Sequence, residues 1–251
     1  MDLITLMKNS IKVVVLTGAG MSTESGLKDF RSNGGLWAGK DPMRIASTST
    51  IRPKQEDEST DDYLARLEEF KEFYRWRVQE IDKYQPNEGH RILSKWQKDG
   101  KIHRVITQNV DGYHQKAGSE EVIELHGNLL GFHCEWCKAA YKKSIFDTPL
   151  GVLCAVCSVG IVRPNLTLFG EPLSDDINVA IREAKNADLM LVLGTSLQVS
   201  PANLLPVETI MRDGLVAIIN RDSTPLDKYA SVVVNDRDIT EVLKYIDSKL
   251  Y

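Results

Sequence analysis

The chain has 251 residues, 42% of them hydrophobic, and its 35 acidic and 31 basic side chains give a formal net charge of −4. This length allows one large domain and a smaller one, and the charge balance argues against an electrostatic grip on nucleic acid or on an anionic membrane. The apolar runs are far shorter than a membrane span, and no secretory leader pattern opens the chain. We therefore expect a cytoplasmic protein.

The first strong pattern is an apolar run that ends in a glycine turn. Residues 13–16 read Val-Val-Val-Leu, and Gly18-Ala19-Gly20 follows one position later. Such a run predicts a strand buried on both faces, and the free N–H groups after the turn favour an anion such as a pyrophosphate. The dehydrogenase fingerprint fits poorly, because Thr23 stands where its third glycine belongs. A turn with only a structural role remains the alternative.

Helical and extended patterns alternate along most of the chain. A short helix is expected before the first strand, and apolar side chains at steps of three and four predict an amphipathic helix over residues 61–83. Further helices are expected at residues 87–97, 175–185 and 240–249 and after Pro201, and strands at 102–107, 122–125, 189–193, 215–219 and 232–234. This alternation predicts an α/β fold with a Rossmann-like, doubly wound parallel sheet.

Polar clusters follow four of the expected strands directly. They are Gly18-Ala19-Gly20, Gln108-Asn109-Val110-Asp111, Gly194-Thr195-Ser196 and Asn220-Arg221. Ligands of such sheets bind outside the carboxyl ends of the strands. One cluster alone is more often a turn, but four at one edge predict a shared ligand.

Two Cys-x-x-Cys pairs, Cys134 with Cys137 and Cys154 with Cys157, are separated by sixteen residues. This spacing predicts one tetrahedral four-thiolate zinc site, which is structural because no coordination position stays open. The cytoplasmic interpretation disfavours disulfides, and the presence of two matched pairs disfavours a redox motif. We expect a sheet domain of residues 1–37, 86–126 and 166–251. A smaller lobe would combine a helical insert, residues 38–85, with the zinc ribbon, residues 127–165.

His126 follows the expected strand 122–125 and should lie at the same sheet edge as the glycine turn. A neutral imidazole can act as a general base near pH 7. A buried histidine that donates to a backbone carbonyl is the structural alternative.

In combination these features resemble the sirtuins, the Sir2-like family of NAD-dependent protein deacylases, in their bacterial type. The resemblance covers nearly the whole chain and rests on motifs in the expected order. They are Gly18-Ala19-Gly20-Met21-Ser22, residues 25–31, Thr107-Gln108-Asn109-Val110-Asp111, His126-Gly127, the two cysteine pairs, Arg163-Pro164-Asn165, Phe169-Gly170-Glu171 and Gly194-Thr195-Ser196.

The resemblance implies that NAD is consumed as a co-substrate. The acyl-lysine oxygen would attack the ribose carbon that carries nicotinamide, giving nicotinamide, deacylated lysine and 2'-O-acyl-ADP-ribose. His126 would be the base and Asn109 would hold the ribose, so these two are the catalytic candidates. The implied NAD-binding residues are Gly18, Ala19, Gly20, Thr23, Asp29, Phe30, Arg31, Trp37, Gln108, Asn109, Val110, Asp111, His126, Gly194, Thr195, Ser196, Asn220, Arg221 and Ile239.

The implied partner is an acylated lysine in a protein substrate, and we expect a monomer. Leu166, Thr167 and Phe169 would contact the substrate, whose backbone would add as a strand. Tyr74 and Arg77 share one helix face and resemble the pair by which the desuccinylase branch holds an acidic acyl chain. An ordinary basic helix face is the alternative.

Lys28 departs from the family, which usually has proline there, so the rigidity of the loop that carries Asp29, Phe30 and Arg31 is open. None of the departures removes a catalytic group. Mono-ADP-ribosyl transfer from the same NAD site is the alternative activity, and a non-catalytic NAD sensor is the alternative outside enzymes.

Overall fold

A computed structural model describes residues 2–29, 35–36, 41–148 and 152–250. The chain forms two compact units. We call them the sheet unit, made of Met1–Asp29, Gln85–His126 and Leu173–Tyr251, and the ribbon unit, made of Phe30–Tyr84 and Gly127–Pro172. Residues 166–172 belong to the ribbon unit, whereas the sequence-based division placed them with the sheet. Which ligand each unit binds stays a prediction.

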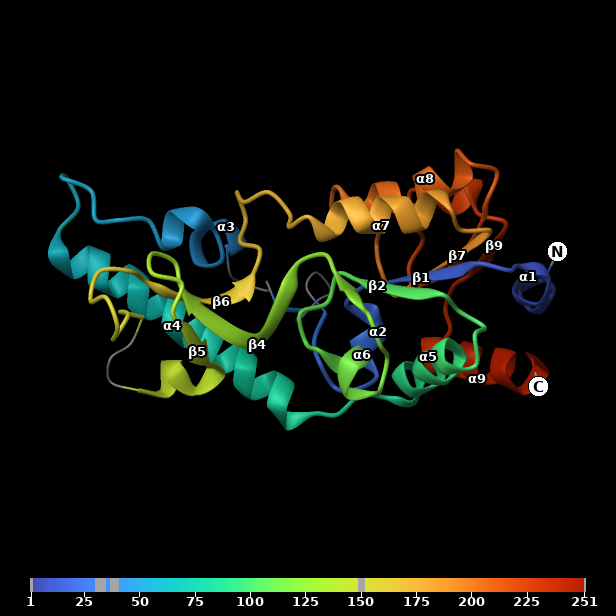
Figure 1. Ribbon diagram of the computed structural model, residues 1–251, viewed down its shortest axis with the longest axis horizontal. Coiled ribbons are helices and arrows are strands. Elements are labelled where there is room, and N and C mark those ends of the chain that lie inside the picture. Colours follow the sequence, from blue (N-terminus) through green and yellow to red (C-terminus); the bar gives the residue numbers. More distant parts are fainter. Residues whose placement is uncertain (1, 30–34, 37–40, 149–151, 251) are drawn as a thin grey trace. The chain divides into compact units, whose positions relative to one another are not determined.

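The sheet unit contains a six-stranded parallel sheet in the order β3-β2-β1-β7-β8-β9, which confirms the predicted fold class (Figure 1). Its strands are β1 (Val13–Thr17), β2 (Arg104–Thr107), β3 (Ile123–Glu124), β7 (Leu189–Leu193), β8 (Leu215–Ile219) and β9 (Val232–Val234). Thr17 pairs with both Thr107 and Leu193, so β1, β2 and β7 end level with one another. The loops that follow these three strands therefore meet.

Helices cover both faces of this sheet (Figure 1). One face carries α1 (Leu3–Asn9), α5 (Glu88–Lys98) and α9 (Ile239–Leu250), and the other carries α7 (Asp176–Lys185) and α8 (Leu205–Ile210). Within β1, Val13 and Val15 pack toward the first face, and Val14 and Leu16 toward the second. This explains why the strand is apolar at every position rather than at alternate ones.

Short elements complete the sheet unit. They are α2 (Gly20–Thr23), α6 (Tyr113–Lys116) and the 3₁₀ turns η3 (Ala202–Leu204) and η4 (Asp227–Tyr229). None of the helices in the described part of the chain has the length and hydropathy needed to span a bilayer.

The ribbon unit is built around the long helix α4 (Thr60–Lys83) and an antiparallel sheet in the order β5-β4-β6. Its strands are β4 (Gly127–Cys134), β5 (Ala140–Lys142) and β6 (Val162–Leu166), and its shorter elements are α3 (Pro42–Ile45), η1 (Thr48–Thr50) and η2 (Lys143–Asp147). Phe146 bridges the helix and the sheet, because its ring lies 6.2 Å from that of Phe70 and 4.9 Å from that of Phe132. These aromatic edge contacts form the core of the unit.

Candidate functional site

Two glycine turns touch at the carboxyl ends of β1 and β7. Gly20 N–H donates to the carbonyl oxygen of Gly194 over 2.8 Å. A Cβ atom added to Gly18 would lie 2.6 Å from Cβ of Thr195, and one added to Gly20 would lie 2.7 Å from Cα of Gly194. Both distances are too short for a side chain, so glycine is needed for this backbone contact. The helix after the turn, α2, has only four residues.

Asn109 lies beside these turns, with 5% of its surface exposed. Its Nδ2 donates to the Gly18 carbonyl oxygen at 3.0 Å and to Ser22 Oγ at 3.2 Å. Ser22 in turn donates to Oδ2 of Asp111 at 2.7 Å. Oδ1 of Asn109 is buried and has no hydrogen-bond partner among the described residues. A buried acceptor without a partner is rare and is suited to a ligand that carries a hydroxyl or amide donor.

Gln108 links two neighbouring strand ends, because its Nε2 donates to Thr195 Oγ1 at 3.0 Å. The structure therefore brings together the predicted residues that follow β1, β2 and β7. The glycine contacts and the orphaned acceptor of Asn109 fit a nucleotide with ribose hydroxyls, which is the fit that NAD requires.

His126 lies in the turn between β3 and β4, two residues after β3 ends, and its Nδ1 atom lies 2.9 Å from the carbonyl oxygen of Gln108. Burial lowers the pKa of His126 and outweighs the opposing effect of this hydrogen bond. The ring is therefore neutral at pH 7, which is the form that can accept a proton. The sequence left open a structural role for this histidine, a hydrogen bond to a backbone carbonyl. That bond is present, but it involves only Nδ1, so Nε2 can still act as a base.

Two further histidines lie beneath this cluster, and the sequence reasoning did not single them out. His114 Nε2 contacts Thr17 Oγ1 at 2.9 Å, and His90 Nε2 lies 3.5 Å from Ser22 Oγ. Burial lowers the pKa of His114 to about 4 and that of His90 to about 2, so both rings are neutral. Ser22 was also missed as a site residue, although it lies within the glycine motif.

The other predicted NAD residues that the structure describes lie in loops or at helix ends, and some of them make contacts with protein groups. Arg221 pairs with Asp29 at 3.9 Å and with Asp222 at 3.2 Å. Thr23 Oγ1 donates to the Gly20 carbonyl oxygen three residues earlier, within α2. Asn220 lies buried after β8 and Ile239 lies buried at the start of α9. Ala19 precedes α2, Val110 lies between Asn109 and Asp111, and Ser196 follows Thr195. Phe30, Arg31 and Trp37 lie outside the described residues.

The predicted substrate residues lie in the ribbon unit. Tyr74 and Arg77 are both buried on α4, with 3% and 8% of their surfaces exposed. The Tyr74 ring packs against Phe70 at 4.7 Å and Phe73 at 5.0 Å, and burial raises its pKa. Leu166 ends β6, Thr167 follows it, and Phe169 is half-exposed.

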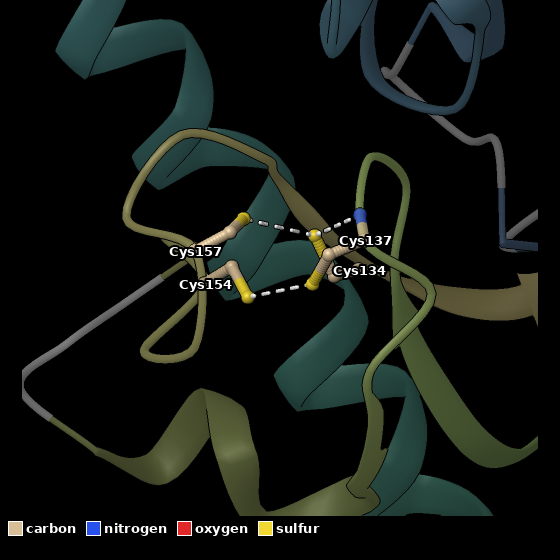
Figure 2. A group of neighbouring side chains, drawn as sticks. All are labelled: Cys134, Cys137, Cys154 and Cys157. Atoms are coloured by element: carbon tan, nitrogen blue, oxygen red, sulfur yellow. Dashed lines mark hydrogen bonds between the residues drawn. The ribbon is translucent and has the colours of Figure 1, made fainter.

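The four cysteines converge as the spacing predicts (Figure 2). Their Sγ atoms lie within 4.8 Å of one another, with 3.7 Å between Cys134 and Cys157 and 3.6 Å between Cys137 and Cys154. These separations exceed a disulfide bond and suit thiolates around a single ion. The Gly160 N–H points at Cys157 Sγ over 3.3 Å, the kind of outer contact that orients a ligand. The donor set fits one zinc ion.

Comparison with known proteins gives one consistent family. The model of the Sir2 family matches residues 18–201. The chain is 46% identical over 239 residues to NAD-dependent protein deacetylase 1 of Geobacillus kaustophilus, covering 94% of this chain and 93% of the relative. It is 42% identical over 246 residues to the NAD-dependent protein deacetylase of Oceanobacillus iheyensis, covering 97% and 98%.

Solved structures agree with these relatives. A Sir2–p53 peptide–NAD+ structure is 34% identical with a TM-score of 0.80, and a structure of Sir2Tm bound to a propionylated peptide is 34% identical with a TM-score of 0.83. Each covers 99% of this chain and 98% of its own.

Proposed function

Because the chain belongs to the Sir2 family, we propose that it is an NAD-dependent protein-lysine deacylase, with acetyl-lysine as the principal substrate. The observation that carries this proposal is the neutral, half-buried His126 with Nδ1 held by the Gln108 carbonyl, at the sheet edge where Asn109 offers an unpaired acceptor. Bound NAD would supply the electrophilic ribose carbon and the nicotinamide leaving group.

This chain's own groups would then divide the work. The glycine turns let the pyrophosphate approach the backbone after β1 and β7. Asn109 Oδ1 would accept a hydrogen bond from the ribose, and Asn109 itself is held by Gly18 and Ser22. Nε2 of His126 would take a proton from a ribose hydroxyl. We assign Asp29, Arg221, Asn220 and Ile239 to the rim of the same NAD site.

The four-cysteine cluster would hold a structural zinc ion. Cys134 and Cys154 are buried, and four thiolates complete a tetrahedral shell with no position for water or substrate. The ion would hold together the two turns that carry the cysteine pairs, at residues 134–137 and 154–157. Free thiols in such a site suit a reducing compartment, so we propose that the enzyme is cytoplasmic.

We also propose that the enzyme is a monomer. Light scattering after gel filtration measures its mass and tests this proposal.

Incubation with NAD and an acetylated peptide tests the activity. We expect equal amounts of nicotinamide, free lysine peptide and 2'-O-acetyl-ADP-ribose. ADP-ribose attached to protein without peptide turnover would instead favour the mono-ADP-ribosyltransferase. Failure of zinc-loaded protein both to bind NAD and to release nicotinamide with any acylated lysine would reject the proposal.

The choice of acyl chain is a separate question. Arginine can bind a carboxylate through two hydrogen bonds, and Arg77 lies one helical turn from Tyr74. Tyr74 packs between two phenylalanine rings, however, which favours acetyl over an acidic acyl chain. Acetyl, succinyl and longer acyl peptides should be compared with wild type and Arg77→Met. A loss confined to succinyl turnover would assign Arg77 to acidic acyl recognition.

A further inference from the structure

An ion pair between buried Arg163 and partly exposed Glu171 organises the segment after β6. Arg163 is 5% exposed, and its two terminal nitrogens donate to the two carboxylate oxygens of Glu171. The Nη2 atom of Arg163 also donates to the Leu166 carbonyl oxygen at 2.7 Å, and Glu171 Oε2 accepts from Leu168 N–H at 2.8 Å. The pair therefore holds the backbone on both sides of Thr167.

The far end of the segment is held by the backbone around the start of η1. Phe169 N–H donates to the Ala46 carbonyl oxygen at 2.9 Å, and Thr48 N–H donates to the Phe169 carbonyl oxygen at 3.0 Å. Gly170 has φ of +91°, and a Cβ atom there would lie 2.9 Å from Thr48 Oγ1. Glycine thus turns the chain back so that Glu171 reaches Arg163.

The side chains of residues 166–169 differ in burial. Leu168 is 2% exposed and packs inward, whereas Phe169 is 44% exposed. Leu166 and Thr167 are half-buried. The conformation is thus fixed from beneath while the neighbouring side chains remain accessible.

Stability alone is a poor explanation for the pair. The side chains of Arg163 and Glu171 are only 7% and 23% exposed, so both charges lose much of their hydration. Replacing ion pairs with such desolvated charges by apolar side chains often leaves stability unchanged or improved. The Nε atom of Arg163 is in addition buried without a hydrogen-bond partner among the described residues. A costly pair that makes two specific backbone contacts is better explained by the geometry it imposes.

We propose that Arg163 and Glu171 are positioning residues that preset the 166–169 segment for the acylated peptide. This inference rests on the proposed deacylase function and adds to it the groups that fix the substrate-binding backbone. A segment already held in its bound conformation loses less entropy when an extended peptide docks on it, so the pair acts on peptide affinity. It makes no direct contact with the peptide.

The test uses Glu171→Gln, which removes the charge and one acceptor at nearly constant volume, and Arg163→Lys, which keeps the charge but loses the fork. The peptide KM should rise on the order of tenfold with the NAD KM unchanged and kcat changed less, the pattern of lost binding rather than lost chemistry. Glu171→Asp, which keeps the carboxylate, should recover part of the loss. Asp82→Asn breaks the exposed Asp82–Lys143 pair of the same unit and should change neither KM.

An unchanged peptide KM in folded variants, or an equal rise in both KM values, would overturn the inference. If Glu171→Gln does not fold, Arg163→Lys decides the question. If both variants unfold, the pair is structural and the inference is rejected. Inactive wild type, by contrast, would reject the deacylase function itself.

Discussion

Nδ1 of His126 and the carbonyl oxygen of Gln108 lie 2.9 Å apart, which fixes the tautomer of the ring. A carbonyl oxygen can only accept a hydrogen bond, so Nδ1 carries the proton and Nε2 keeps its lone pair. The backbone thus selects which nitrogen would act as the base in the proposed mechanism.

His126→Asn should abolish this base while keeping a donor that can reach the Gln108 carbonyl. We expect turnover to fall about 10²- to 10⁴-fold, the usual contribution of a general base, with the melting temperature near that of wild type. His103→Asn is the matched control, because His103 lies before β2 and pairs with Glu183. A variant at position 126 that retains wild-type turnover would remove the imidazole from the mechanism.

The pH profile of activity should follow the lowered pKa of His126. Because burial disfavours the imidazolium, the base form persists below the ordinary value of 6.5. The acid limb of kcat/KM should therefore fall at a pH below 6.5 and not at or above it. Profiles measured between pH 5 and 8, with the folded fraction checked at each pH, test this. An acid limb above 6.5 would contradict the burial argument.

Stability should fall with acid because His90 and His114 are buried in the neutral form. The unfolded chain binds their protons below about pH 6.5, whereas the folded chain resists protonation until about pH 4 for His114 and about pH 2 for His90. The stability present above pH 6.5 is thus lost as the pH falls toward those values, by up to about 1.4 kcal/mol per pH unit for each ring.

Denaturant unfolding at pH 7.5, 6.5 and 5.5, with zinc present, measures this slope. His114→Asn should reduce the total stability lost between pH 7.5 and pH 5.5 by about 1.4 kcal/mol, the contribution of one histidine over that interval. Equal slopes for wild type and His114→Asn would show that His114 is not buried in the neutral form.

Zinc removal should unfold the ribbon before it affects chemistry. Chelation or Cys137→Ser should lower the melting temperature by about 10 °C or more, since metal binding and folding of such modules are coupled. Ser144→Ala, an exposed change on η2, is the control. An unchanged melting temperature together with lost turnover would instead make the metal catalytic.

Gly18→Ala should weaken NAD binding and stability together. Its Cβ would lie 2.6 Å from Thr195 Cβ and 2.8 Å from the Gly194 carbonyl oxygen, so the two turns must separate, at a cost of about 1–3 kcal/mol. Gly100→Ala is the control. Its Cβ atom would meet nothing within 4 Å, so any loss of stability in this variant comes from the positive φ alone. Calorimetric titration with NAD should show lower affinity only for Gly18→Ala. Wild-type affinity in that variant would place the pyrophosphate elsewhere.

Strong local patterns made much of the fold predictable. The buried run at Val13–Thr17 and the helix at Thr60–Lys83 appear within one residue of expectation, because continuous apolar runs and amphipathic periodicity act locally. The sequence predicted a zinc ribbon at residues 127–165, but it did not locate the strands of that ribbon. Its strand β4 has an irregular burial pattern and a register shift between Gly127 and Phe132, so no simple alternation marks it.

The site was predictable only in part, for a similar reason. Glycine turns and strand-end polar residues follow from the topology rule, whereas the roles of Ser22, His90 and His114 depend on contacts across 68 to 97 positions of sequence. Arg163 and Glu171 each lie in a motif that the sequence analysis identified. Their hydrogen bonds to the backbone of Leu166 and Leu168 could not be predicted, because they depend on the turn of the chain at Gly170. Contacts between residues so far apart in the sequence produce no periodic pattern in it.

The level ending of β1, β2 and β7 bears on the order of events during synthesis. Asn109 bonds to a residue 91 positions earlier and Gln108 to one 87 positions later, so this cluster of strand-end side chains stays incomplete until Thr195 has been synthesised. We therefore expect that a nascent chain cannot bind the dinucleotide before Thr195 is made, so the dinucleotide cannot guide the folding of the earlier strands. Ligand retention therefore marks finished molecules, and partial translation products should be left to quality-control proteases without that protection.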